Sequence, residues 1–300
     1  MNTNDIPIEA LLKRLHLANA RRVWTELTAR AEKEDWSFRD FLAVLVSEEV
    51  AMRQQTRLAR LTRRAHFPFL KTIDDFDFTL QSQLRITMLG SFLSPDFVTD
   101  GRGLILSGKT GRGKTHLAIA IAYRAIQNGF DALFTTAAAL IDDLSRATRY
   151  GEMRSALARY LKPDVLVIDE VGYLTYGTDA ANVLFHVVNE RHLRKLPMIF
   201  TTNKALRSWG HVLHDEDLAQ AIVDRVLERG RLLQLDGPSM RTKHLPLDAE
   251  DPQASQDQPA KVSGIGQQEF PEPTGAPTPG VTIPTLRLSR TGRNRWARLV

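Results

Sequence analysis

Residues 108–115 read Gly-Lys-Thr-Gly-Arg-Gly-Lys-Thr, which matches the G-x-x-x-x-G-K-[ST] pattern of a phosphate-binding loop. A short apolar run at 104–107 precedes the loop, and an apolar helical pattern begins near Lys114. Glycines let the backbone wrap closely around phosphate oxygens, and the helix N-terminus adds inward-pointing N–H groups. The stretch therefore predicts a P-loop α/β fold in which this loop joins a strand to a helix.

The whole loop is a candidate binding site for the phosphates of ATP. Lys114 is expected to reach the β- and γ-phosphates, and the hydroxyl of Thr115 to ligate Mg²⁺. A chance glycine-rich turn is the alternative, and the flanking strand and helix argue against it. The predicted ATP-binding residues are Gly108, Lys109, Thr110, Gly111, Arg112, Gly113, Lys114 and Thr115.

Two carboxylates, Asp169 and Glu170, follow the apolar run 165–168. An apolar run alone indicates a buried parallel strand, but open α/β sheets bind their ligands at the C-terminal ends of such strands. Asp169 suits the ligand shell of Mg²⁺, and Glu170 suits a general base for the attacking water. A base of this kind favours an ATP-hydrolysing protein over a small-molecule kinase.

The pattern around these motifs divides the 300-residue chain into three parts. Residues 1–66 alternate apolar and charged positions at helical spacing and predict a small helical domain, with Ser37 and Asp40 as a capping box that opens a long helix. Residues 67–247 alternate short apolar runs with helical patterns and predict a parallel five-stranded sheet flanked by helices. Strands are expected at 104–107, 132–135, 165–169, 198–202 and 232–235, and helices at 115–128, 179–194 and 215–229.

Residues 248–300 have a different composition. Seven of the chain's 14 prolines lie between Pro252 and Pro284, among Gln, Ser, Thr and Gly. Such a segment buries too little apolar area to offset the entropy that ordering would cost, so it is expected to be disordered.

Composition and charge exclude several classes of protein. The chain has no cysteine, which rules out disulfides and thiol catalysis, and no apolar run approaches the roughly 20 residues that span a bilayer. The N-terminus does not have the pattern of a secretory signal, so a cytoplasmic location is expected. The formal net charge of +5 is compatible with nucleic-acid binding.

The order of these motifs resembles the IstB-like helper ATPases of bacterial insertion sequences, which belong to the AAA+ superfamily and are related to the helicase loader DnaC and the initiator DnaA. The similarity covers residues 8–247. It is carried by residues 71–78 (KTIDDFDF), 108–117 (GKTGRGKTHL), 167–173 (VIDEVGY), 184–191 (LFHVVNER), 201–203 (TTN), 221–227 (AIVDRVL) and 237–241 (GPSMR). Lys109 and Arg112 depart from the pattern, because they place two extra positive charges in the loop.

The resemblance implies further catalytic residues. Asn203, at the end of the strand 198–202, corresponds to the sensor 1 residue that holds the attacking water. Arg225 corresponds to an arginine finger, which acts on the nucleotide of a neighbouring subunit and so implies a homo-oligomer. Arg229 is the alternative finger, and Arg241 is a candidate second sensor.

The resemblance also implies that ATP drives assembly on duplex DNA and that the partner is a transposase encoded by the same element. An ATP-gated loader of the DnaC kind is the alternative function. For DNA contact, the arginines that recur at three- and four-residue steps suggest a basic helix face, and a solvated face or an intramolecular contact is the alternative. These arginines are Arg53, Arg57, Arg60, Arg63 and Arg64.

Overall fold

The computed structural model describes residues 7–173 and 176–240. The chain divides into two compact units, Met1–Pro246 and Leu247–Val300. The predicted disordered tail and Arg241 lie outside the described residues. Within the described part, no helix has the length and apolar character needed to cross a membrane.

A single five-stranded sheet organises the first unit, with strand order β2-β3-β4-β1-β5. Each adjacent pair of strands is parallel. The strands are β1 (Gly103–Ser107), β2 (Ala132–Thr136), β3 (Val165–Val171), β4 (Met198–Thr202) and β5 (Arg231–Gln234). Every strand expected from the sequence is present to within two residues at each end, and the predicted α/β fold class is confirmed.

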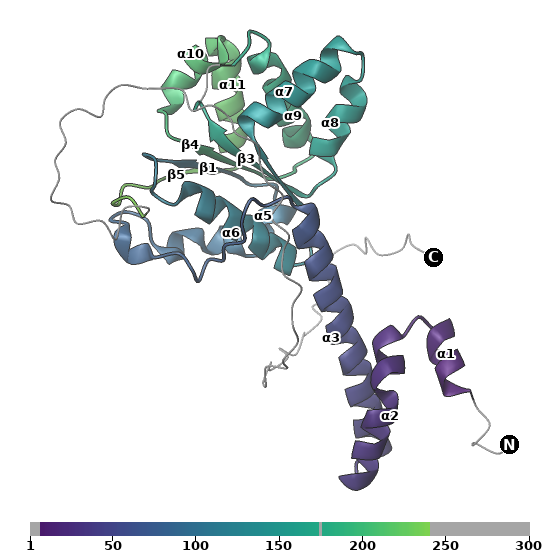
Figure 1. Ribbon diagram of the computed structural model, residues 1–300. Helices are drawn as coiled ribbons and strands as arrows, with labels where there is room; N and C mark the ends of the chain where they lie inside the picture. Colours follow the sequence, from purple (N-terminus) through teal and green to yellow (C-terminus); the bar gives the residue numbers. More distant parts are fainter. Residues whose placement is uncertain (1–6, 174–175, 241–300) are drawn as a thin grey trace, which may run out of the picture. The chain divides into compact units, whose positions relative to one another are not determined.

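Helices cover both faces of this sheet (Figure 1). One face carries α4 (Gly90–Leu93), α5 (Asp96–Thr99) and α6 (Lys114–Gln127), and the opposite face carries α7 (Ala137–Arg149), α8 (Met153–Leu161), α9 (Ala180–Leu193), α10 (Trp209–Leu213) and α11 (Glu216–Leu227). Short 3-10 turns are η2 (Phe78–Leu80), η3 (Ile86–Leu89) and η4 (Leu206–Ser208). The expected helices 115–128, 179–194 and 215–229 correspond to α6, α9 and α11.

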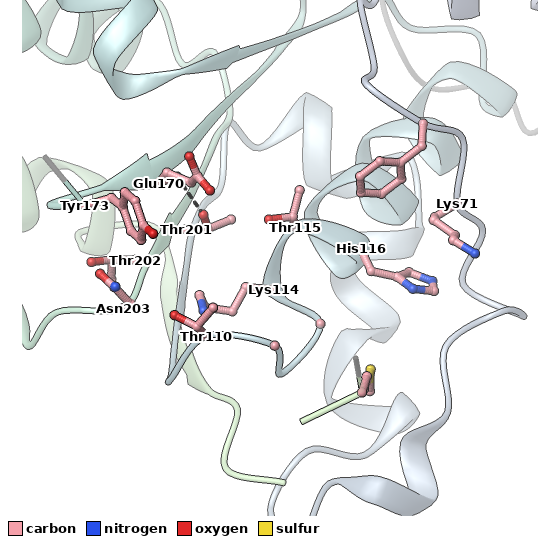
Figure 2. A pocket seen from close by; sticks show the side chains of 14 residues that line it. Lys71, Thr110, Lys114, Thr115, His116, Glu170, Tyr173, Thr201, Thr202 and Asn203 are labelled. Atoms are coloured by element: carbon pink, nitrogen blue, oxygen red, sulfur yellow. Dashed lines mark hydrogen bonds between the residues drawn. The ribbon is translucent and has the colours of Figure 1, made fainter. Parts of the chain in front are cut away.

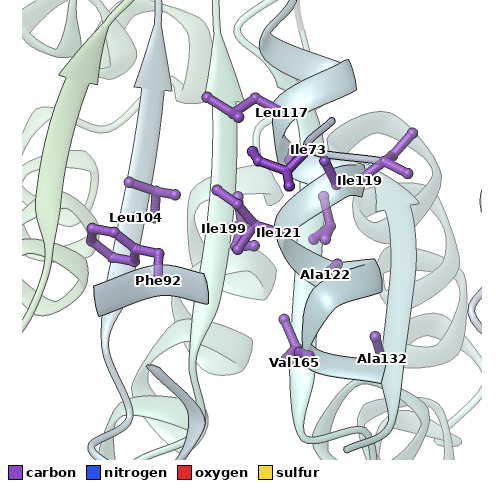
Figure 3. Close-up of a cluster of buried hydrophobic side chains, with 14 of the residues drawn as sticks. Ile73, Phe92, Leu104, Leu117, Ile119, Ile121, Ala122, Ala132, Val165 and Ile199 are labelled. Carbon is purple, nitrogen blue, oxygen red and sulfur yellow. The ribbon is translucent and has the colours of Figure 1, made fainter. Parts of the chain in front are cut away.

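The two faces of the sheet give two hydrophobic clusters. The first packs α6 against β1, β3 and β4, with Leu117, Ile121 and Ile199 fully buried (Figure 3). The second packs α7, α9 and α11 on the other face, with Trp209 fully buried. Because both faces are covered, the strands read as continuous apolar runs, and polar side chains occur only where strands end.

The first helices of the described chain are α1 (Ile8–Arg14), α2 (Ala18–Lys33) and α3 (Phe38–Arg64). Ser37 caps α3 as predicted, because its Oγ accepts the N–H of Asp40 at 3.2 Å. Glu49, buried within α3, accepts the N–H groups of Asn19 and Ala20 at 2.8 and 2.9 Å. A carboxylate of α3 therefore caps the start of α2 and fixes the pairing of the two helices.

The predicted border at residue 66 does not separate compact units. The end of α3 enters the first hydrophobic cluster through Leu61 and Ala65, and Phe67 follows. The N–H of Phe134 in β2 donates to the carbonyl of Ala65 at 2.8 Å. The last turns of α3 thus pack as part of the α/β unit, because their apolar side chains are buried there.

Candidate nucleotide-binding site

A cavity of about 300 Å³ opens at the C-terminal ends of β1, β3 and β4. Figure 2 shows Glu170, Tyr173 and Asn203 on one side of it, His116 and Lys71 on the other, and Lys114 between them. Its lining is Phe69, Lys71, Thr110, Gly111, Gly113, Lys114, Thr115, His116, Glu170, Tyr173, Thr201, Thr202, Asn203 and Met240. The fold thus brings the phosphate loop together with Glu170 and Asn203, which lie far apart in the sequence.

The backbone of the loop shows why glycine is required. Gly113 has φ 85°, in the left-handed region, and a Cβ there would lie 2.7 Å from Cε2 of Phe76 and 2.9 Å from Sδ of Met240. Only glycine combines this conformation with such close neighbours. Gly108, Lys109 and Arg112 belong to the loop but do not line the cavity. The Arg112 guanidinium instead donates to the carbonyl of Leu235 at 3.4 Å, and Lys109 is exposed, so neither extra charge fills the phosphate position.

Lys114 and Thr115 begin α6. The ammonium of Lys114 donates to the carbonyl of Lys109 at 2.9 Å, so the lysine lies back across the loop. The hydroxyl of Thr115 lies 3.0 and 3.1 Å from the two carboxylate oxygens of Asp169. The two predicted Mg²⁺ ligands are therefore within hydrogen-bonding distance of each other.

Asp169 is almost completely buried at the end of β3. Burial raises the pKa of Asp169, although hydrogen bonds from Thr201 and Thr115 and the charge of Lys114 act in the opposite direction. A buried carboxylate is costly unless a positive charge compensates it. No group of three or more His, Asp or Glu side chains among the described residues forms a cation site by itself. Thr115 and Asp169 therefore fit a Mg²⁺ ion that takes its other oxygen ligands from phosphates and water, as this ion usually does.

Glu170 has φ 61°, a left-handed conformation that costs a non-glycine residue free energy. Its N–H donates to Oγ1 of Thr201 at 2.9 Å, and its carbonyl accepts from the hydroxyl of Tyr176 at 3.3 Å. The Thr201 hydroxyl also donates to Asp169. One threonine at the end of β4 thus holds both acidic residues of β3, and the strained backbone turns the Glu170 side chain into the cavity.

Asn203 follows β4 and lines the same cavity. Its side-chain oxygen Oδ1 is buried and has no hydrogen-bond partner in the described part of the chain. A buried polar atom left in this way costs free energy, so it indicates a group that the protein itself does not supply. A water molecule in the cavity would meet this need, because it can donate a hydrogen bond to Oδ1.

The other end of the cavity contains residues to which the sequence assigned no role in the site, although Lys71 and Met240 lie in segments that carry the family resemblance. Phe69 and Lys71 come from the segment after α3, and Met240 from the segment after β5. Nε2 of His116 donates to the carbonyl of Thr72 at 3.0 Å, which ties this segment to the start of α6. Nothing in their spacing indicates the site, because only the tertiary fold brings these segments to the loop.

Phe76 and Phe78 are aromatic residues close to the site. Two roles are possible for them from the sequence, contact with the adenine or packing in the hydrophobic core. Neither lines the cavity; Phe76 belongs to the first hydrophobic cluster and Phe78 packs against it. Phe76 also packs edge-on against the ring of His116, with centroids 5.2 Å apart. Phe76 therefore packs against the phosphate loop at Gly113 without lining the cavity.

Arg225 lies outside the nucleotide cavity, in a separate open depression between α9 and α11. Its Nε donates to Oδ1 of Asn189 at 3.1 Å, one Nη donates to the carbonyl of Ala221, and the guanidinium lies 4.6 Å from the ring centre of Phe185. These contacts hold the guanidinium between α9 and α11, and Arg225 does not line the nucleotide cavity. Arg229 is exposed, with Nη2 3.8 Å from Glu228.

The five arginines predicted to contact DNA are all exposed on α3, but three have partners within the protein. Arg53 binds Glu49 at 2.7 Å and the carbonyl of His16. Arg57 donates to the carbonyl of Gly129 at 2.7 Å, and Arg64 pairs with Asp131 at 3.1 Å. The intramolecular alternative therefore applies to these three, and Arg60 and Arg63 are the two without such a partner among the described residues.

Known proteins are similar in sequence to this chain over most of its length. One relative, named for ATP binding, is the protein of insertion sequence IS5376 from Geobacillus stearothermophilus, which is 35% identical over 79% of this chain and 94% of the relative. Another, also named for ATP binding, is the protein of insertion sequence IS21 from Pseudomonas aeruginosa, which is 33% identical over 79% of this chain and 89% of the relative. Among solved structures, AMPPCP-bound DnaA from Aquifex aeolicus gives a TM-score of 0.49 at 20% identity, covering 59% of this chain and 54% of that one. Residues 10–247 match the family profile described as IstB-like ATP binding protein. The chain therefore belongs to the family of IstB-like ATP-binding proteins of insertion sequences.

Proposed function

We propose that this protein hydrolyses ATP in the presence of Mg²⁺, assembles as an oligomer on duplex DNA, and thereby directs or stimulates a transposase. The observation that carries the proposal is the arrangement at the end of β3, where one Thr201 hydroxyl contacts both the buried Asp169 and the backbone of Glu170 beside the phosphate loop. The names of the relatives, ATP-binding proteins of insertion sequences, support a role in transposition.

Each residue has a defined role in the proposed reaction. Thr115 would hold bound Mg²⁺ directly, and Asp169 would hold it through water molecules. The ion would supply positive charge to the phosphate oxygens. Lys114 moves from the Lys109 carbonyl to the β- and γ-phosphates. Glu170 takes a proton from a water molecule, the water oxygen bonds to the γ-phosphorus, and the bond from that phosphorus to ADP breaks. Asn203 orients the water with its amide, which supplies Oδ1 with a hydrogen bond.

We assign the arginine finger to Arg225 acting in trans. Asn189 and Phe185 keep its guanidinium oriented before a neighbour arrives, so less entropy is given up when it meets the nucleotide. Its Nη2 donates no hydrogen bond within the described part of the chain, and Arg225 lines an open depression.

The test is ATP turnover with and without duplex DNA, in wild type and in Glu170→Gln and Arg225→Ala. Wild-type turnover should rise with DNA and with protein concentration, because both promote assembly, and both variants should lose the stimulated rate while still binding ATP. Turnover indifferent to DNA and to concentration would contradict the proposal and favour a loader-type, partner-binding role. Transposition assays with the neighbouring transposase then test the last step.

A further inference from the structure

A second cavity, of about 400 Å³, lies along the outer edge of β2 and shares no lining residue with the nucleotide cavity. We call it the β2-edge cleft. β2 is the outermost strand of the sheet on this side, since it pairs with β3 alone in the described part of the chain. The cleft is lined by Arg64, His66, Asp131, Ala132, Leu133, Phe134, Thr135, Arg159, Tyr160, Lys162 and Pro163.

The charge of this cleft is strongly one-sided. Three cationic side chains and one histidine converge from separate segments, namely the end of α3, the segment after it, and the end of α8, whereas Asp131 is the one carboxylate among the described residues of the lining. They are Arg64, His66, Arg159 and Lys162. Clefts lined by charges of one sign concentrate ligands of the opposite sign.

The existing ion pairs leave these cations available. Arg64 pairs with Asp131 at 3.1 Å and Arg159 with Asp143 at 2.8 Å, and the two arginine side chains are 50% and 63% exposed. Their carboxylate partners, Asp131 and Asp143, are 21% exposed, so each pair is open to solvent on the arginine side, where a phosphate can also bind the guanidinium. Lys162 and His66 are exposed and have no ion-pair partner among the described residues.

The cleft also continues the basic surface of α3. Arg57 holds the last turns of α3 to the carbonyl of Gly129, and Ala65 accepts the N–H of Phe134 in the edge strand. Arg60 and Arg63 lie in these same turns and precede the cleft along the chain. These contacts fix the last turns of α3, which carry Arg60 and Arg63, against the edge strand that lines the cleft.

We propose that the β2-edge cleft binds backbone phosphates of duplex DNA, and so extends the DNA contact from α3 onto the α/β unit. This inference rests on the proposed function and adds Arg159, Lys162 and His66 to the contact. Phosphate contacts from arginine and lysine give affinity that depends on salt and little on sequence. The cleft is therefore expected to hold DNA in place without reading its bases.

The test measures duplex affinity of the full chain by fluorescence anisotropy over a range of salt concentrations. The double variant Arg159→Ala/Lys162→Ala should bind more weakly at low salt, and its log–log salt slope should shrink by about 0.9 for each DNA phosphate that the cleft no longer neutralises. Arg146→Ala/Arg154→Ala is the matched control, because it also removes two exposed charges, one of them ion-paired with Asp142 as Arg159 is with Asp143. Thermal midpoints of both double variants confirm that they fold.

The possible outcomes distinguish this inference from the proposed function. If wild type binds no duplex, the proposed function itself fails. If Arg60→Ala/Arg63→Ala lowers the slope while Arg159→Ala/Lys162→Ala matches the control, the cleft does not contact DNA and only this inference is overturned. Weakened binding of polyglutamate together with an unchanged duplex slope would also overturn it, because the cleft would then suit an acidic protein segment.

Discussion

At the scale of single residues, backbone conformation separates the site from the rest of the sheet. Glu170 is left-handed within β3, where an ordinary strand residue has negative φ. Thr201 and Tyr176 compensate this strain with hydrogen bonds to its N–H and carbonyl groups. The backbone conformation that positions the Glu170 carboxylate thus lowers local stability.

This strain gives a prediction for two substitutions that both remove the carboxylate. Glu170→Gly should have a free energy of unfolding about 1 kcal/mol higher than that of Glu170→Ala, and so unfold at a higher urea concentration. The reason is that only glycine adopts positive φ without a Cβ clash. Both should lose ATP turnover. Equal stability of the two variants in urea denaturation would show that the conformation is not strained.

Gly113 gives a second prediction at this scale. Gly113→Ala should weaken ATP binding at least tenfold, because its Cβ would meet Phe76 and Met240 beneath the loop. Gly151→Ala is the control: Gly151 also has positive φ, 74°, but nothing lies within 4 Å of its Cβ position. Both substitutions should cost about 1 kcal/mol of stability through the positive φ, and Gly113→Ala should cost more because of its close contacts. Only Gly113→Ala should change nucleotide affinity, measured by titration with a fluorescent ATP analogue. Equal affinities would remove the packing argument.

At the scale of elements, single polar residues fix how helices sit. Arg191 of α9 is fully buried and donates to the carbonyls of Tyr160, Pro163, Asp164 and Pro197, which joins α9 to the ends of α8 and the starts of β3 and β4. No carboxylate is among its hydrogen-bond partners in the described part of the chain. Its guanidinium thus donates to four backbone carbonyls, and one of them, that of Pro197, also accepts the N–H of Leu166 at 3.2 Å.

Removing this guanidinium should therefore destabilise the fold strongly. Arg191→Met is expected to lower the free energy of unfolding by about 3 kcal/mol, since several carbonyls lose a charged donor. Arg194→Met, three residues on and in an exposed pair with Glu190, should change it by less than about 0.5 kcal/mol. Urea denaturation of both variants measures the difference, and similar losses would show that Arg191 acts through something other than these bonds.

Glu49 gives a pH-dependent prediction for the N-terminal helices. Burial alone would raise the pKa of Glu49, but the N–H groups of Ala20 and Asn19 and the Arg53 guanidinium together lower it below the ordinary value of 4.5. A lowered carboxyl pKa adds stability that is complete above the ordinary pKa and disappears as the pH falls through the folded-state pKa. Glu49→Gln should therefore speed amide exchange at the start of α2 at pH 7, with a loss of roughly 2 kcal/mol.

The difference between wild type and Glu49→Gln should shrink as the pH falls below 4.5, because wild-type Glu49 is then protonated too. Hydrogen exchange of α2 across this pH range measures it. A difference that stays constant with pH would mean that shape, rather than charge, is responsible.

At the scale of the whole molecule, the finger role that we propose for Arg225 would require a second copy, because Arg225 does not line the nucleotide cavity of its own chain. A mixing experiment tests this directly. Lys114→Ala and Arg225→Ala should each lose most of the DNA-stimulated turnover, by a factor of about 10³ for an arginine finger. Mixed together they should recover activity, because an Arg225→Ala subunit binds ATP and a Lys114→Ala neighbour supplies the finger. Mixtures that remain inactive, while each variant still joins wild-type oligomers, would exclude a finger in trans.

The fold class, the five strands, the phosphate loop and the place of the two carboxylates at the end of β3 could be predicted from the sequence alone. These features are local: a loop must have glycines at fixed spacing, buried strands must be apolar, and polar groups can occur only where such strands end. The capping of α3 by Ser37 was also readable, since the cap and its partner lie three residues apart.

Only the tertiary structure decided which distant groups meet. Thr201 contacts Asp169 and Glu170 across 32 and 31 positions, and Asn189 orients Arg225 from 36 positions away. Arg53, Arg57 and Arg64 contact His16, Gly129 and Asp131, which are also far away along the chain. The β2-edge cleft draws its charges from segments far apart in sequence, between Arg64 and Lys162. Spacing along the chain carries no signal for such contacts, because they depend on strand order and helix packing, which set distances only after the chain has folded.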